Sequence, residues 1–170
     1  DAAVESALEL QGAVLDQWSA SIEDPAEAFA RSFRLTGRVH RILPEVSRVL
    51  LNRGAGLIDS ASGLAPRALR DIERGCSAGR FSVRDPQSAL LIVAGAAIVL
   101  GHSIHGHPDV DDSALTDQLT EDLLRMLGLP ADEAVRLSGL ALSDVRALLG
   151  EALPHLDAAS GVVGWGSPYP

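Results

Sequence analysis

The longest apolar run of the chain lies between Ala89 and Gly101, where no side chain is charged or polar. A helix built from this run is hydrophobic on every face, which predicts that protein covers it on all sides. The run is shorter than the roughly 20 apolar residues that cross a membrane, and Asp85 and several histidines bound it closely. We therefore expect a central helix over residues 85–107 with two packing faces, one for its own core and one for a partner subunit.

Apolar residues recur at helical spacing on both sides of this run, and no stretch alternates with period two for long enough to form a strand. Asp24 followed by Pro25 is typical of a helix start, with Glu27 placed to close the cap. Residues 54–63 fit either a broken helix or a loop. The pattern thus predicts an all-α multi-helix bundle with helices over residues 2–19, 24–40, 44–54, 66–79, 85–107, 112–127, 130–140 and 143–153.

Length and composition indicate one domain over residues 1–157, followed by an irregular tail rich in glycine and proline over residues 158–170. A single cysteine excludes a disulfide within the chain, and without a signal peptide we expect a cytoplasmic protein that contacts no membrane. The net charge of -9 repels phosphate, so we expect no DNA binding by these residues alone. The chain begins at Asp1 inside a helical pattern, which indicates that residues upstream are missing.

Three stretches of the chain form a recognisable set: FRLTGRVHRILPEVSRVLL at residues 33–51, RDIERGCSAGRFSVRDPQSALLIVAGAAIVLGH at residues 70–102 and ALTDQLTEDLLRMLGLP at residues 114–130. Together they resemble the C-terminal ligand-sensing and dimerisation domain of the TetR family of transcriptional regulators. The resemblance implies that a separate N-terminal helix-turn-helix of about 45 residues, absent from this sequence, binds the DNA. It also implies that residues 2–19 form the helix that leaves that DNA-binding head.

A ligand pocket is expected between the inward faces of the helices that surround the central one. Its predicted lining is Trp18, Phe29, Phe33, Gly37, His40, Leu69, Ile72, Cys76, Ile92 and Ala96. The inward face of this helix carries the bulky Phe33, then the small Gly37 and then the polar His40. This order favours a cavity beside Gly37. The ligand expected there is mostly apolar or amphipathic, with one polar handle. The competing interpretation is that these side chains simply fill the core.

The small residues Ala94, Ala97 and Gly101 recur at helical spacing and form a stripe where a second helix can approach closely. Together with the amphipathic helix over residues 112–127, this stripe predicts a homodimer through a four-helix interface. The predicted interface residues are Ala94, Ala97, Gly101, Leu115, Leu119, Leu123 and Met126.

Histidine and cysteine side chains, which bind metals or act as nucleophiles in other proteins, have a simpler structural role in this sequence. His102, His105 and His107 could share a metal, but helix C-termini favour histidine and no matching cysteine or acid accompanies them. We therefore expect no metal and no cofactor. No nucleophile motif is present, and Cys76 fits a small apolar filler better than a reactive thiol, so we expect no enzyme.

An arginine row follows one face of the helix over residues 24–40, at Arg31, Arg34, Arg38 and Arg41. An anionic ligand, or DNA beside a missing head domain, could meet this row. A solvated face paired with acids such as Glu27 and Glu45 is the more ordinary use of charges at helical spacing, and is the interpretation we adopt.

These observations favour a small-molecule sensor in which the ligand allosterically controls DNA binding by a missing head domain, expected to act as a repressor. One alternative is a helical dimerisation or adaptor module with a filled core and no ligand. A further alternative is a metal-dependent protein built on the histidines.

Overall fold

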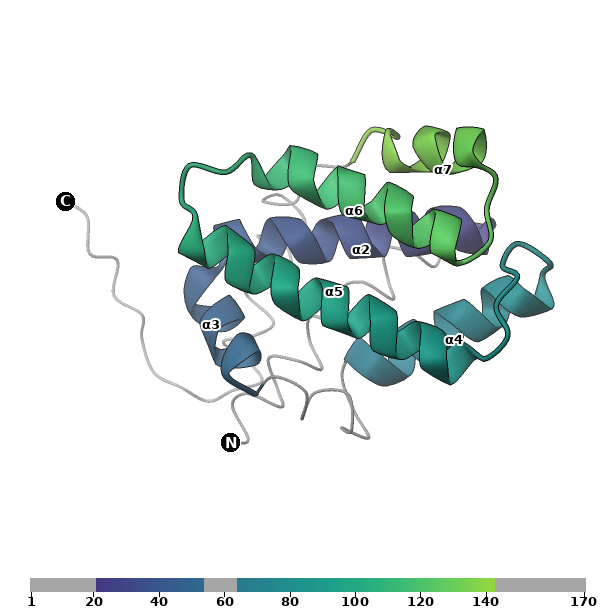
Figure 1. Cartoon of the computed structure of the whole chain (residues 1–170), viewed down its shortest axis with the longest axis horizontal. Helices are drawn as coiled ribbons and strands as arrows, with labels where there is room; N and C mark the ends of the chain where they lie inside the picture. Colours follow the sequence, from purple (N-terminus) through teal and green to yellow (C-terminus); the bar gives the residue numbers. More distant parts are fainter. Residues whose placement is uncertain (1–20, 54–63, 143–170) are drawn as a thin grey trace.

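The computed structural model describes residues 21–53 and 64–142, and within these ranges the chain forms six helices and no strand (Figure 1). The helices are α2 (Pro25–Ile42), α3 (Pro44–Arg53), α4 (Leu64–Ser77), α5 (Pro86–Gly106), α6 (Asp112–Met126) and α7 (Ala131–Ser138). The predicted all-α bundle is therefore confirmed. The helices expected over residues 2–19 and 143–153, the ambiguous residues 54–63 and the tail over residues 158–170 lie outside the described residues.

Aspartates begin three of these helices. Asp24, Asp85 and Asp111 precede α2, α5 and α6, and each accepts hydrogen bonds from backbone N–H groups of the first turn. A proline in the first turn of α2 and of α5 adds a backbone angle that already suits a helix. Glu27 turns away from the cap and pairs with Arg31 at 2.8 Å. The start of α2 was therefore predictable from local sequence, although Glu27 takes the pairing predicted for it with the arginine row rather than the predicted closing of the cap.

Helix α2 lies at the centre of the described bundle (Figure 1), where it contacts all five other helices. Eleven of its 18 residues are buried, whereas only six of the 21 residues of α5 are. Helix α5 therefore packs on its own core with one face only, and the cover predicted for its other face, a partner subunit, stays a prediction. Helix α2 is amphipathic and still central, because its polar face meets polar partners inside the bundle.

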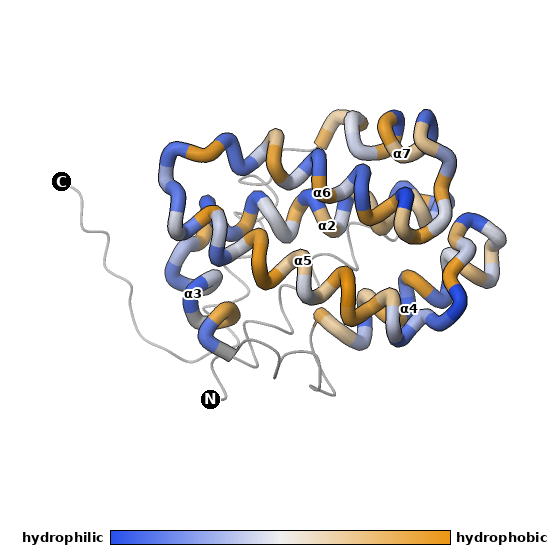
Figure 2. The backbone as a smooth tube through the Cα atoms, in the orientation of Figure 1, coloured by the Kyte–Doolittle hydropathy of each residue, from blue (hydrophilic) through white to orange (hydrophobic). Residues whose placement is uncertain are grey.

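Helix α5 leaves large apolar side chains in solvent, with Leu91 57%, Ile92 52% and Val99 66% exposed. Figure 2 shows apolar residues along most of its length. By length and composition alone α5 could cross a membrane. Its packing against α2, α3, α4 and α6 is instead that of a core helix with one uncovered face.

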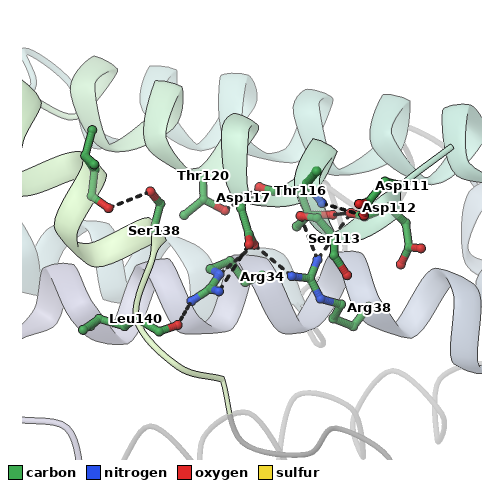
Figure 3. A network of polar contacts seen from close by, with 12 residues as sticks. Arg34, Arg38, Asp111, Asp112, Ser113, Thr116, Asp117, Thr120, Ser138 and Leu140 are labelled. Atoms are coloured by element: carbon green, nitrogen blue, oxygen red, sulfur yellow. Dashed lines mark hydrogen bonds and ion pairs between the residues drawn. The ribbon is translucent and has the colours of Figure 1, made fainter.

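The arginine row of α2 meets helix α6 (Figure 3). The Nε of Arg34 donates to Asp117 at 2.8 Å and its Nη1 donates to the Leu140 carbonyl at 2.6 Å. Arg38 donates to the same carboxylate at 2.9 Å. Because Arg34 is only 5% exposed and Arg38 pairs with α6, the interpretation as a solvated face is wrong for these two arginines, whereas Arg31 pairs with Glu27 as predicted. The partners of Arg34 and Arg38 lie far along the chain, which helical periodicity does not reveal.

Candidate functional site

Three polar side chains form a hydrogen-bonded series where helices α2, α3 and α5 meet. His40 lies in the last turn of α2, Ser47 in the first turn of α3 and His105 in the last turn of α5. The Oγ of Ser47 lies 2.6 Å from the Nδ1 of His40 and 2.7 Å from the Nε2 of His105. The sequence singled out both histidines, but nothing in its local pattern distinguishes Ser47 from any other helical serine.

The environment of this series holds His40 neutral. The pKa of His40 is lowered to about 4, first by burial and then by the nearby His105 and His102, while a hydrogen bond with the Ala97 backbone opposes this change. The pKa of His105 is also lowered, by partial burial first and then by Arg48, Arg41 and His102, while Glu45 opposes this. Near pH 7, both rings are therefore uncharged imidazoles that can accept a hydrogen bond at one nitrogen and donate at the other.

The remaining nitrogen of His40, Nε2, is buried and has no hydrogen-bond partner among the described residues. The side chain as a whole is only 6% exposed. Buried polar atoms are usually paired, and besides Ser47 the Ala97 backbone also interacts with this ring through a hydrogen bond that raises its pKa. That His40 is the polar group of a ligand site stays a prediction.

The predicted apolar lining falls into one connected region. Phe29 and Phe33 stack with ring centroids 6.4 Å apart, and Phe81 meets Phe29 edge-on at 5.8 Å. Both phenylalanines of α2 lie in the same buried cluster as Ile72. Leu69, Cys76 and Ala96 are partly buried and pack against that cluster. That these residues line a cavity, rather than fill a core, stays a prediction.

Two predicted lining residues lie elsewhere. Ile92 is on the uncovered face of α5 and is more than half exposed. A Cβ added to Gly37 would lie 2.4 Å from side-chain atoms of Thr116, so helix α6 occupies the space where a cavity was expected. The reason is that α6 packs directly on α2 at this point. Trp18 lies outside the described residues.

The predicted dimer stripe also needs correction. Gly101 is buried, and a Cβ there would meet the His40 ring at 2.7 Å and Leu51 at 2.8 Å, so this glycine serves the close approach of α5 to α2 and α3. Leu123 is buried in the core of the chain. The other predicted positions are half-buried, and their part in a dimer interface stays a prediction: Ala94, Ala97, Leu115, Leu119 and Met126. The most exposed large apolar side chains of α5 are Leu91, Ile92 and Val99, which the predicted stripe did not include.

The histidines at the end of α5 diverge in the structure. His105 turns to Ser47, whereas the Nδ1 of His107 lies 3.0 Å from the backbone carbonyl of Ser103. His102 is exposed. Within residues 21–53 and 64–142, no group of three histidine, cysteine or acidic side chains is placed to hold a metal ion.

Residues 24–139 match the family described as "Tetracyclin repressor-like, C-terminal domain". Among solved structures, the chain is similar to RolR in complex with its ligand resorcinol, with 30% sequence identity and a TM-score of 0.69 over 83% of this chain and 69% of that one. It is similar to RolR without ligand, with 30% identity and a TM-score of 0.67 over 83% of this chain and 72% of that one. No curated protein sequence matches the chain.

Proposed function

Because the chain belongs to the TetR family of transcriptional regulators, we propose that it senses a small, mostly apolar molecule and thereby controls a DNA-binding domain. The observation that carries this proposal is the likeness to RolR, which was solved with resorcinol bound. Resorcinol is an aromatic ring with hydroxyl groups, so it combines an apolar body with polar handles. A molecule of that type suits the His40 imidazole, which lies about two turns beyond Phe33 on α2.

The proposed pocket lies between α2, α4 and α5. Phe29, Phe33 and Leu69 offer apolar contact, and His40 offers the hydrogen bond. Ile72, Cys76 and Ala96 complete the lining that we retain, with Trp18 as a further candidate from the sequence alone. Apolar burial, at roughly 25 cal/mol per Å², and the hydrogen bond to His40 both contribute to the affinity for such a ligand.

The proposed mechanism is allosteric and involves no catalysis. Ligand binding favours one arrangement of the helices over another, and in a homodimer this changes the spacing of two DNA-binding heads. The net charge of -9 favours DNA contact through a separate DNA-binding domain rather than through this domain. A cytoplasmic location and a repressor role belong to the same proposal.

Binding of resorcinol to the 170-residue chain tests the proposal directly. At a ligand concentration of 100 times Kd, binding stabilises the folded state by about 2.7 kcal/mol, which raises Tm by roughly 5 to 10 °C. His40→Leu should weaken binding by about tenfold, while His102→Gln, a change at an exposed histidine of α5, should leave it unaltered.

No rise in Tm with resorcinol, and none with other small phenols, would contradict the sensor. It would favour the adaptor with a filled core, in keeping with the close contact between Thr116 and Gly37, which lies between Phe33 and His40 on α2.

A further inference from the structure

Ser47 couples the two histidines because its hydroxyl has a single proton. The Oγ of Ser47 is within hydrogen-bond distance of one nitrogen from each ring, at 2.6 Å for His40 and 2.7 Å for His105. A hydroxyl that donates to one ring must accept from the other if both bonds are made. The position of the proton on His105 therefore fixes the position of the proton on His40.

Two arrangements satisfy both bonds. In the first, His40 Nδ1–H donates to Ser47, which donates to His105 Nε2, and His40 Nε2 is left as an acceptor. In the second, His105 Nε2–H donates to Ser47, which donates to His40 Nδ1, and the proton of His40 lies on Nε2, which is then a donor. A protonated His105 carries hydrogen on both nitrogens, so it allows only the second arrangement.

We propose that His105, Ser47 and His40 form a proton-coupled relay that presents His40 Nε2 to the ligand as either acceptor or donor, and so selects an uncharged ligand with a hydroxyl group. A hydroxyl pairs with Nε2 in both arrangements, whereas an ether oxygen pairs only with the donor form and an ammonium only with the acceptor form. The choice of ligand rests on the proposed function, whereas the coupling of the two rings does not.

The groups around the relay determine when it switches. His105 and His102 of α5 face His40, and Arg41 of α2, Arg48 and Glu45 of α3 and His102 face His105. Among these, only histidines ordinarily change charge between about pH 8 and about pH 5. Because the pKa of His40 is lowered to about 4, that ring stays uncharged in most of this range, and we assign the uptake of the proton to the more exposed His105.

Nitrogen NMR of the full chain labelled at histidine tests the relay without any ligand. As pH falls from about 8 to about 5, the His40 signals should move to the form with hydrogen on Nε2, in step with protonation of His105. Ser47→Ala should abolish this movement at His40 while His105 still titrates. His102→Gln, the matched control, should preserve it. His40 signals that stay constant in the wild type, or that move equally in Ser47→Ala, would overturn the relay.

The ligand class is tested with resorcinol and its dimethyl ether, by calorimetry at both ends of this pH range. At about pH 8 the wild type should prefer resorcinol by about threefold to tenfold, and at about pH 5 the preference should fall below about twofold, because both molecules can then only accept. In Ser47→Ala and in His105→Gln the preference should not change with pH.

A wild-type preference for resorcinol that is the same at both ends of the pH range would overturn the selection of a hydroxyl. If the NMR coupling is present and neither molecule binds, the proposed function fails and the relay stands.

Discussion

At Gly37 the backbone of α2 comes so close to α6 that even one added carbon would lie 2.4 Å from the Thr116 side chain. At Gly95, in the middle of α5, an added carbon meets no atom of the described chain within 4 Å. The two glycines are both helical, yet one permits a close approach of helices and the other leaves an open surface. Their substitution should therefore change stability in opposite directions.

Gly37→Ala should lower the free energy of unfolding by about 1 to 2 kcal/mol, because overpacking against Thr116 outweighs the gain in helix propensity. Gly95→Ala is the matched control and should raise it by about 0.5 to 1 kcal/mol. Urea unfolding monitored by circular dichroism measures both. Equal effects at the two positions would show that α6 does not pack on Gly37.

Some residues of the candidate site were predictable from the sequence, and others were not. His40 and the phenylalanines of α2 were predictable, because one helix's periodicity places them on one face. Ser47 was not, since its role depends on two histidines from other helices. The buried state of Arg34 was hidden for the same reason, because its partners Asp117 and Leu140 are distant in the chain.

At the scale of helices, Arg80 connects three parts of the bundle. It lies in the turn between α4 and α5 and donates to Asp24, the cap of α2, and to Glu133 of α7, at 2.8 and 2.6 Å. Arg136 shares Glu133 at 2.8 Å. Hydrogen bonds from Arg136 and Arg80 lower the pKa of Glu133 to about 2, and that from Arg80 lowers the pKa of Asp24. The cluster joins the start of α2 to elements that follow it by more than fifty residues.

Arg80→Met should lower Tm at neutral pH, and the difference from wild type should shrink as the solution is acidified. Depressed carboxyl pKa values stabilise the fold above the unfolded pKa, and that stabilisation is lost as pH falls through the folded pKa. For Glu133 the window runs from its ordinary 4.5 down to about 2. Thermal unfolding of both proteins across this window measures the effect. A difference in Tm that is constant from neutral pH to the bottom of the window would contradict it.

Helix boundaries were largely predictable because they depend on local signals. Asp24 and Asp85 cap α2 and α5, and Pro44 opens α3, as the sequence indicated. Helix α4 begins at Leu64, two residues before the expected start at Pro66, which is within the usual uncertainty of helix ends. The orientation of each helix about its own axis was less predictable for α5, since a run that is apolar on every face contains no signal for its outward side.

At the scale of the whole molecule, the all-α fold and the family were accessible from sequence, but the oligomeric arrangement depends on which face the bundle leaves uncovered. Leu91, Ile92 and Val99 form that face on α5. Contiguous apolar surface of this kind commonly marks an interface. Because a second copy presents the same patch, a two-fold axis beside α5 would cover both at once. We expect the adjoining partly exposed side chains of α6, such as Leu119, to take part.

Val99→Glu should therefore convert a dimer into monomers. A carboxylate placed opposite its own symmetry mate adds repulsion and an unpaired buried charge, which should weaken association by at least about 100-fold. Val135→Glu, at an exposed valine of α7 far along the chain from α5, is the matched control and should leave the dimer intact. Sedimentation velocity at micromolar concentration measures all three proteins, with circular dichroism to confirm that each is folded. A monomeric wild type, or a dimer that Val99→Glu leaves unchanged while Val135→Glu dissociates it, would move the interface away from α5.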